Sequence, residues 1–421
     1  MIDAMKRIVW ILLAASLCLL PLSCNRLEPD PIDDGENPFT PISLNTKQQG
    51  YVQAGTTFAW KFLDKVDEHA RQENEKTWFV SPLSLQIALG MLLNGAQNET
   101  AAEICRTLGY QEGETAEINA WCKLMLEQLP KLDKKTDLTL ANAIFYNKKL
   151  TLKGPFKDNV TSWYEAQLEA LDFTQTTASA NIINKWCDKQ TKGMIPHVLD
   201  EVSPSALAYL VNALYFKSEW REKFPKGKTG NETFTSEMGS KGKVKMMKLD
   251  GKTFSYGEND LCQAVCLPYG NGNYAMTVLL PRNGHTVREV TASLIQDGDI
   301  RLWGRAEVDL WLPRFETKYH IKFNDILCSL GMPRSFDPRR ADFLAMCDKP
   351  SHVDFVQQDA VIKVDEEGTE AAAVTVIGME LTAVFPHEAP PKVVFHADHP
   401  FLYLITETST GAVLFAGKYD L

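Results

Sequence analysis

One segment near the C-terminal end of the chain combines residue types and spacing that suit the addition of a strand to a sheet. From Val364 to Thr375 the sequence reads Val-Asp-Glu-Glu-Gly-Thr-Glu-Ala-Ala-Ala-Val-Thr. Because successive side chains of a strand point to opposite faces, the segment can be sorted into two sets. One set has no charge, and the other has both glutamates. The uncharged set is Thr369, Ala371, Ala373, Thr375, Ile377 and Met379; the other is Glu370, Ala372, Val374, Val376, Gly378 and Glu380.

The local propensities of this segment do not hold it in the strand conformation. Gly368 begins it, and the alanines at 371–373 are poor strand formers. Its face pattern nevertheless lets one side be buried in a sheet. We therefore interpret residues 368–379 as a loop that can become a strand, which is a conformational switch rather than a catalytic site.

The segment Glu366–Ala373 resembles the hinge of the reactive loop in serpins. Further motifs resemble serpin segments in the order of that family, and together they cover roughly residues 50 to 421. These motifs are Trp78-Phe-Val-Ser-Pro-Leu-Ser84, residues 138–145, 183–193, 210–220, 244–248, His399-Pro-Phe401 and 411–417. The resemblance implies an α+β serpin fold, with a large central mixed sheet, two smaller sheets, surrounding helices and an exposed reactive loop at about 366–391.

Periodicity alone also predicts an α+β protein. Helical periodicity dominates the first half of the chain and strand-like runs dominate the second, without regular βαβ alternation. The predicted helices are 56–66, 84–93, 101–108, 117–129, 180–192 and 321–330. The predicted strands are 138–146, 206–216, 264–267, 275–280, 307–312, 359–364, 393–396, 401–406 and 412–415.

The resemblance implies an inhibitor of endopeptidases that acts as a suicide substrate and is not an enzyme. The target cleaves a bait bond in the loop, and the hinge then enters the central sheet with the acylated protease attached. Family spacing from Glu366 places the bond at Thr382–Ala383, with Val384 and Phe385 as alternatives. No Arg or Lys lies between Lys363 and Lys392. An elastase-like serine protease, or a papain-like cysteine protease, is therefore the expected target.

The resemblance also assigns residues around the opening of the central sheet. Ser81, Ser84 and Asn212 match positions beneath the opening, and Trp220 matches the aromatic residue at its top. An alternative is that the serines and the asparagine only satisfy local backbone groups. Gln358 stands where the family often has histidine. Glutamine both donates and accepts hydrogen bonds, but it does not titrate.

Two other classes of function compete with the inhibitor. One is a non-inhibitory serpin that acts as a surface binding or scaffold module; the small residues Thr369, Ala371 and Ala373 argue against it. The other is a surface lipoprotein that binds glycan or nutrient, or a hydrolase. Sequence motifs of hydrolases and nucleotide-binding enzymes, such as Gly-x-Ser-x-Gly and His-Glu-x-x-His, are absent.

The N-terminal residues resemble a bacterial lipoprotein signal. Lys6 and Arg7 precede an apolar run, residues 8–20, which is too short to span a bilayer. Ser23 then precedes Cys24, which would carry lipid; an ordinary cleavable signal is the alternative. We expect a signal peptide at 1–23, a flexible acidic and proline-rich tether at 24–45 and one serpin domain at 46–421. The implied location is the bacterial outer membrane or cell surface.

The composition limits the partners further. The chain has 421 residues and a formal net charge of −10, which disfavours nucleic acid and heparin-like cofactors. We expect a monomer whose partners are the target endopeptidase and, through the lipid, a membrane. The seven cysteines after Cys24 are an odd, scattered set and predict no disulfide framework. We expect no cofactor and no metal; Cys262 with Cys266 and His396 with His399 are better explained by packing and by the His-Pro-Phe motif.

Overall fold

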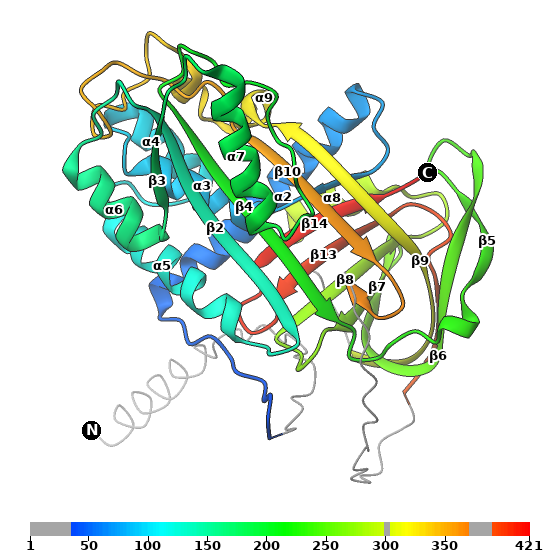
Figure 1. The fold of residues 1–421 in the computed structure, drawn as a ribbon. Helices are drawn as coiled ribbons and strands as arrows, with labels where there is room; N and C mark the ends of the chain where they lie inside the picture. The colour runs from blue at the N-terminus through cyan, green and yellow to red at the C-terminus, as the bar shows by residue number, and fades with distance from the viewer. Residues whose placement is uncertain (1–34, 299–303, 370–389) are drawn as a thin grey trace, which may run out of the picture.

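The computed structural model describes residues 35–298, 304–369 and 390–421, and it has the expected α+β architecture (Figure 1). The α-helices of these ranges are α2 (Thr46–Gln72), α3 (Pro82–Leu93), α4 (Asn98–Leu108), α5 (Thr115–Gln128), α6 (Gly154–Tyr164), α7 (Thr176–Gln190), α8 (Val287–Asp297) and α9 (Asn324–Leu330). The first strands are β1 (Trp78–Val80), β2 (Thr136–Asn147), β3 (Gln167–Leu171), β4 (Ala208–Glu219), β5 (Gly230–Thr235), β6 (Lys241–Glu258) and β7 (Cys262–Pro268). The remaining strands are β8 (Tyr274–Pro281), β9 (Gly304–Lys322), β10 (Gln357–Val364), β11 (Gly368–Thr369), β12 (Lys392–His396), β13 (Phe401–Glu407) and β14 (Val413–Tyr419).

The central sheet has the order β3-β2-β4-β11-β10-β9. β3 is parallel to β2, and the other neighbouring pairs are antiparallel, so the sheet is mixed. β11 is only two residues long and lies between β4 and β10. Because β11 is antiparallel to both neighbours, β4 and β10 run in the same direction.

Two smaller groups of strands continue from the long strand β9. Its second half pairs with β10, and its first half pairs with β6 and β12. The first group is β5-β6-β9-β12. The second follows the order β6-β7-β8-β13-β14-β1. The expected arrangement of one large and two smaller sheets is therefore confirmed.

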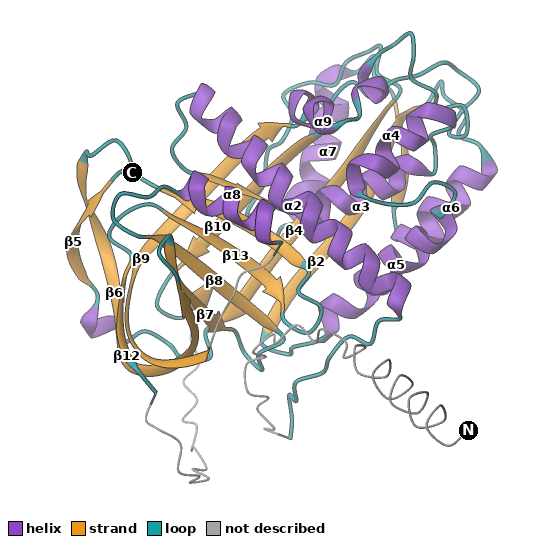
Figure 2. Ribbon diagram, turned by 180° about the vertical axis from the view of Figure 1, so that it is seen from behind, coloured by secondary structure: helices purple, strands orange, loops and turns teal. Residues whose placement is uncertain are grey.

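Helices and strands cover the two faces of the central sheet. α7 crosses one face, over β2 and β4 (Figure 1). Phe145 and Trp186 form an edge-to-face ring pair in this layer. The opposite face rests on the main core, which includes α3, β13 and β14; Figure 2 shows most of the helices on that side. Both faces of β2 and β4 are thus covered where α7 crosses them.

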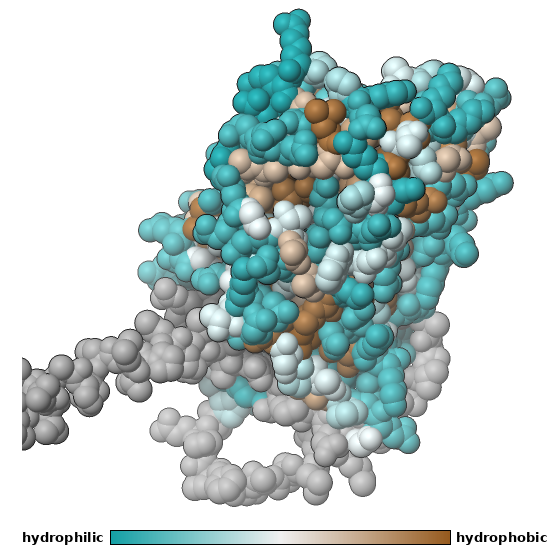
Figure 3. Space-filling model, turned by 90° about the vertical axis from the view of Figure 1, so that its left-hand side faces the viewer, coloured by the Kyte–Doolittle hydropathy of each residue, from teal (hydrophilic) through white to brown (hydrophobic). Residues whose placement is uncertain are grey.

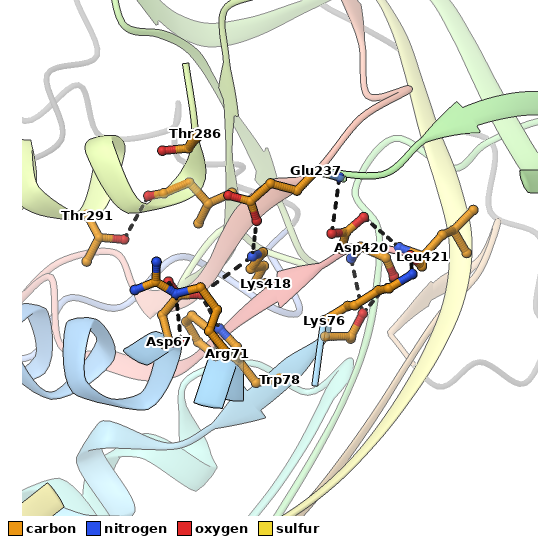
Figure 4. A network of polar contacts seen from close by, with 12 residues as sticks. Asp67, Arg71, Lys76, Trp78, Glu237, Thr286, Thr291, Lys418, Asp420 and Leu421 are labelled. Atoms are coloured by element: carbon orange, nitrogen blue, oxygen red, sulfur yellow. Dashed lines mark hydrogen bonds and ion pairs between the residues drawn. The ribbon is translucent and has the colours of Figure 1, made fainter. Parts of the chain in front are cut away.

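A buried charge network fixes the last strand to the start of the fold (Figure 4). Lys418 of β14 is 3% exposed, and its Nζ lies 2.5 Å from Glu237 and 3.6 Å from Asp67 of α2. Trp78 Nε1 donates to Asp67 at 3.1 Å. The backbone N–H of Glu237 also donates to Asp420. β14, which follows the expected loop in the chain, is therefore part of the core.

The surface carries few large apolar side chains. On the face beside α6, apolar side chains form small separate patches among hydrophilic ones (Figure 3). Within the described ranges, the helices are too short or too polar to cross a bilayer.

Two expectations from the sequence need correction. The predicted helix at 321–330 begins too early, because Ile321 and Lys322 continue β9 and pair with Gln358 and Gln357. The predicted flexible tether at 24–45 extends too far along the chain. From Asn37 to Asn45 its residues lie on the body of the protein, with Asn37 7% and Ile42 8% exposed.

Candidate functional site

The hinge of the loop is already the first step of a new strand in the central sheet. Gly368 pairs with Glu219 of β4, and Thr369 pairs with Ser218. On the other side Thr369 pairs with Val364 at the end of β10. These residues form β11, which is the link between β4 and β10 in the described part of the chain.

Gly368 is required here because the backbone of β4 comes very close. A Cβ at position 368 would lie 2.1 Å from the carbonyl oxygen of Ser218, a distance that no side chain can occupy. The carboxylate of Asp365 accepts the N–H groups of Glu367 at 2.9 Å and of Gly368 at 3.3 Å. Asp365 therefore shapes the turn that brings the hinge to the sheet.

Thr369 lies in an aromatic socket below the sheet. Its side chain is 2% exposed, and its Oγ1 is 2.6 Å from the hydroxyl of Tyr269. The ring of Tyr269 stacks on Trp220 at 4.4 Å between centroids. Trp220 Nε1 donates to the carbonyl of Asp365 at 2.8 Å. The inward direction that the sequence pattern gives Thr369 agrees with this burial.

Two glutamates tie the turn before the hinge to its surroundings. The side chain of Glu366 is 7% exposed; it accepts a hydrogen bond from Thr229 at 2.7 Å and lies 3.8 Å from Arg314. Glu367 lies 2.9 Å from Lys226 and 3.0 Å from Lys223. Hydrogen bonds from Lys226 and then Lys223 lower the pKa of Glu367.

Beyond the hinge, a cleft separates β4 from β10. In the described ranges no backbone ladder joins these two strands directly. The cleft extends from the hinge to the residues beneath the opening. Its lining includes Thr369, the β4 residues Asn212, Leu214 and Phe216, the β10 residues Gln358, Ala360 and Ile362, and Phe79, Ser81, Ser84 and Phe415 from below.

Four of the residues predicted at the sheet opening lie together at the far end of this cleft, namely Ser81, Ser84, Asn212 and Gln358, whereas Trp220 lies at the hinge end. Gln358 uses both ends of its amide on Ser81: Oε1 accepts from the Ser81 N–H at 2.7 Å, and Nε2 donates to the Ser81 carbonyl at 3.3 Å. The Ser81 hydroxyl donates to Leu414 and also caps α3 by accepting from the Ser84 N–H. Ser84 Oγ donates to Asn212 Oδ1. Gln358 thus hydrogen-bonds to both backbone groups of Ser81, although its side chain does not titrate.

The polar network continues from β4 into the helices. Asn212 Nδ2 donates to Asn142 of β2 at 2.7 Å, and Asn142 donates to the carbonyl of Tyr164 at 2.9 Å. The Tyr164 hydroxyl then donates to Asn119 of α5 at 2.7 Å. Burial raises the pKa of Tyr164, so it stays a neutral donor. Opening the sheet at Asn212 must disturb a buried network, which raises the barrier to opening.

Several predicted site residues lie outside the described ranges. They are Cys24, the hinge residues Glu370, Ala371, Ala372 and Ala373, and the bait-bond candidates Thr382, Ala383, Val384 and Phe385. Tyr269 was not predicted from the sequence, because it lies 49 positions after Trp220 and 100 positions before Thr369, and only the fold brings the three residues together. Its position at the end of an apolar run gave no sign of the ring stack.

The cysteine and histidine pairs considered as metal ligands have other surroundings. Cys262 and Cys266 are buried in β7, and burial raises the pKa of both thiols. His399 contacts Asp398 at 2.8 Å and the carbonyl of Pro281 at 2.7 Å. The described residues contain no cluster of three or more ligating side chains that could hold a metal ion.

Comparison with known proteins agrees with this fold. The family model described as "Serpin (serine protease inhibitor)" matches residues 53–420. Serpin B6 of Macaca fascicularis is 32% identical over 381 residues, covering 88% of this chain and 98% of its own length. A serpin-like protein of Thermococcus kodakarensis is 32% identical, covering 82% of this chain and 80% of its own.

Solved structures give the same result. The native state of the thermophilic serpin tengpin superposes with a TM-score of 0.77 at 26% identity, covering 91% of this chain and 96% of its own. Human thyroxine-binding globulin, solved as a complex with thyroxine, superposes with a TM-score of 0.77 at 26% identity, covering 89% of this chain and 98% of its own. The chain belongs to the serpin family.

Proposed function

We propose that this serpin inhibits an endopeptidase by inserting its cleaved loop between β4 and β10. The observation that carries the proposal is the position of β11, which occupies the first two residues of the required strand. The cleft beyond β11 lies directly in its path. Serpins generally bind target proteases, and the small side chains that follow the hinge suit burial in a sheet.

The register of β11 specifies where each later residue would go. Thr369 pairs with Ser218 and Val364, so each further residue would pair one step back along both neighbours. Six residues on, Thr375 would face Asn212 and Gln358. A threonine hydroxyl would there join the network of Ser81 and Ser84. The uncharged set would line the cleft, as the face pattern requires.

The outer set would meet different neighbours. Glu370 would enter between Lys217 of β4 and Lys363 of β10, one step beyond β11. Lys363 is exposed, so this contact would form at the solvent side. Opposite charges in cross-strand positions are mildly stabilising. Glu370 would therefore assist the first step of insertion.

We propose Thr382–Ala383 as the bond cleaved by the target, and an elastase-like enzyme as the target class. A trypsin-like pocket rejects neutral side chains strongly, because its buried carboxylate is left without a partner. Mass spectrometry of the C-terminal fragment checks the bond. A fragment that begins at Ala383 supports the proposal, whereas one that begins at Pro386 assigns the cut to Phe385 and to a chymotrypsin-like or papain-like enzyme.

The inhibitory function is tested with a panel of elastase-like, chymotrypsin-like, trypsin-like and papain-like proteases. We expect an SDS-resistant complex with an elastase-like member. Clean cleavage by every protease of the panel, without a complex, would favour a non-inhibitory serpin that serves as a binding or scaffold module. A catalytically inactive protease variant is the matched control, because it cannot form the acyl bond and should give no stable complex.

We also propose that the chain is a bacterial surface lipoprotein anchored through Cys24. The support is the sequence pattern of a short apolar run that ends at Ser23-Cys24. Cells expressing wild-type protein or Cys24→Ala are labelled with a tagged fatty acid. Label on the wild type alone supports the anchor, and equal labelling of both proteins rejects it.

A further inference from the structure

The first described residues form a strap, residues 36–42, that is bound to the body by a dense set of hydrogen bonds. The strap has no regular secondary structure, yet several of its polar groups form hydrogen bonds with the body of the protein. Asn37 Nδ2 donates to Asp133 at 2.8 Å, and Asn37 Oδ1 accepts from the Lys134 N–H at 3.0 Å. The N–H of Ile42 donates to Ser409 at 3.0 Å.

The turn between β7 and β8 holds the middle of the strap. Asn273 makes two hydrogen bonds to the backbone of Thr40, at 3.0 Å and 2.7 Å. Asn271 Nδ2 donates to the carbonyl of Pro38 at 3.1 Å. Asn271 and Asn273 are 2% and 0% exposed. If the strap left, Asn273 would lose both hydrogen bonds to Thr40, and Asn271 would lose the one to Pro38 but keep the one to the carbonyl of Leu132. Because these amides are buried, the lost bonds would not be replaced by water at once, which makes the strap part of the folded body.

Asp133 is the centre of this arrangement. Its carboxylate is 3% exposed and accepts hydrogen bonds from Asn37, from the N–H of Lys135 at 2.9 Å and from the hydroxyl of Thr136 at 2.8 Å. A Cβ at Gly270 would lie 2.0 Å from Asp133 Oδ2, so the β7–β8 turn also rests directly on the carboxylate.

Two short routes lead from Asp133 to the hinge. In the first, Thr136 donates to Asp133 and lies 2.6 Å from the hydroxyl of Ser218, the residue that pairs with Thr369. In the second, Gly270 follows Tyr269, whose hydroxyl is 2.6 Å from Thr369 Oγ1. Both routes reach the same hinge residue from different strands. Figures 1 and 2 show the strap at the same end of the molecule as the tips of β4 and β10.

We propose that the strap is a positioning element for the hinge, and that Asn37 and Asp133 are its positioning residues. Seated, the strap fixes the carboxylate of Asp133 and the β7–β8 turn, and these hold Ser218 and Tyr269 against Thr369. Displaced, it leaves Asp133, Asn271 and Asn273 without those partners and loosens the socket. A force or a cleavage that removes the segment N-terminal to α2 would then ease entry of the loop into the sheet.

The experiment measures hydrogen–deuterium exchange of the 365–369 peptide in the full chain. Asn37→Asp sets a second carboxylate against Asp133 and should speed exchange of this peptide by about tenfold or more, since a hydrogen bond to a charged group is lost. The double variant Asn37→Asp with Asp133→Asn restores an amide–carboxylate contact but takes the acceptor from the Lys135 N–H, because Asp133 Oδ1 accepts from both groups. Exchange should therefore be at least about threefold slower than in Asn37→Asp without returning fully to the wild-type rate. Asn37→Ala, a milder change, covers the case in which Asn37→Asp does not fold.

Asn45→Ala is the matched control. Asn45 caps α2 through the Gln48 N–H at 2.9 Å and does not contact Asp133, so its loss lowers global stability without loosening the socket. Equal exchange at 365–369 in the Asn37 variants and in Asn45→Ala would overturn the proposal. This inference rests on the proposed function in one respect, namely that residues 368 and 369 act as the hinge of an inserting loop. Exchange needs no protease, so a strap that fails this test is distinguishable from a serpin that fails to inhibit.

Discussion

Gly368 and Ser218 are in backbone contact, and this contact is the point at which the loop joins the central sheet. The carbonyl oxygen of Ser218 occupies the space of a Cβ at position 368, at 2.1 Å. The two-residue strand β11 therefore exists only because residue 368 has no side chain. Insertion of the later loop residues between β4 and β10 would depend on this pairing.

Gly368→Ala is expected to detach β11 from β4. The added methyl group cannot be accommodated without moving the backbone, so loop insertion should become slower than hydrolysis of the acyl-enzyme. We predict a rise of the stoichiometry of inhibition by at least about tenfold, which corresponds to about 1.4 kcal/mol in the competing barriers. Gly230→Ala is the control, because that glycine of β5 has open space around its Cβ position. If both variants have the same stoichiometry of inhibition, the close contact between Gly368 and Ser218 is not needed for insertion of the loop.

Thr369→Arg is expected to turn the inhibitor into a substrate. Thr369 is buried against Tyr269, and an arginine there must lose its hydration beneath the sheet. Glu370→Arg is the matched substitution on the outer face. Its repulsion from Lys217 and Lys363 occurs near solvent and should be milder and screened by salt.

The stoichiometry of inhibition, measured at low and at high salt, separates these two variants. A large, salt-insensitive effect of Thr369→Arg and a small, salt-sensitive effect of Glu370→Arg are expected. If the two variants behave alike at both salt concentrations, the assignment of faces is wrong.

Glu367→Gln tests the ion pairs that hold the turn before the hinge. The pKa of Glu367 is lowered in the folded protein by Lys226 and Lys223, so the ionised form stabilises the fold above the ordinary glutamate pKa of about 4.3. That contribution is lost as the pH falls through the lower pKa of the folded state. The melting temperature of the wild type should exceed that of Glu367→Gln at pH 7, and the difference should shrink below about pH 4. A difference that is constant over this range would exclude the carboxylate as its source.

Gln358→Ala tests the closure at the far end of the cleft. The substitution removes both hydrogen bonds to the backbone of Ser81, and it leaves the Ser81 N–H without this acceptor, while the Ser81 carbonyl keeps the N–H of Leu85. The free energy of unfolding, measured in urea, should fall by about 1–3 kcal/mol. Gln357→Ala is a matched neighbour that loses the bond to Val198 but none to Ser81. We predict that Gln358→Ala loses inhibitory activity spontaneously faster than Gln357→Ala does, and equal rates would contradict a role of Gln358 in closing the cleft.

Sequence patterns located the strands best where apolar residues alternate or cluster. The predicted strand 359–364 lies within β10, and 401–406 lies within β13. α6 and α8 were missed because few apolar residues mark their periodicity; three side chains of α6 and four of α8 are buried. The predicted helix at 321–330 failed at its start because pairing of β9 with β10 overrides local helix propensity.

The site was predictable only in part, for a physical reason. The burial of Thr369 follows from the period of a strand, which is a local property. The socket formed by Trp220 and Tyr269 depends on strands brought together by the fold, and spacing along the chain does not encode it. The strap illustrates the same limit, since prolines and acidic residues suggested a free tether, whereas Asn37 and Asp133, 96 positions apart, bind each other.

The melting temperature before and after cleavage within residues 378–386 shows whether the cleaved loop enters the sheet between β4 and β10. Insertion adds about ten strand hydrogen bonds at about 1 kcal/mol each, and the unfolding entropy of a domain of about 370 residues is roughly 0.8 kcal/mol per kelvin. We predict a rise of at least about 10 °C after a single clean cut. An unchanged or lower melting temperature in the cleaved protein, with the loop fragment still bound, would contradict insertion between β4 and β10.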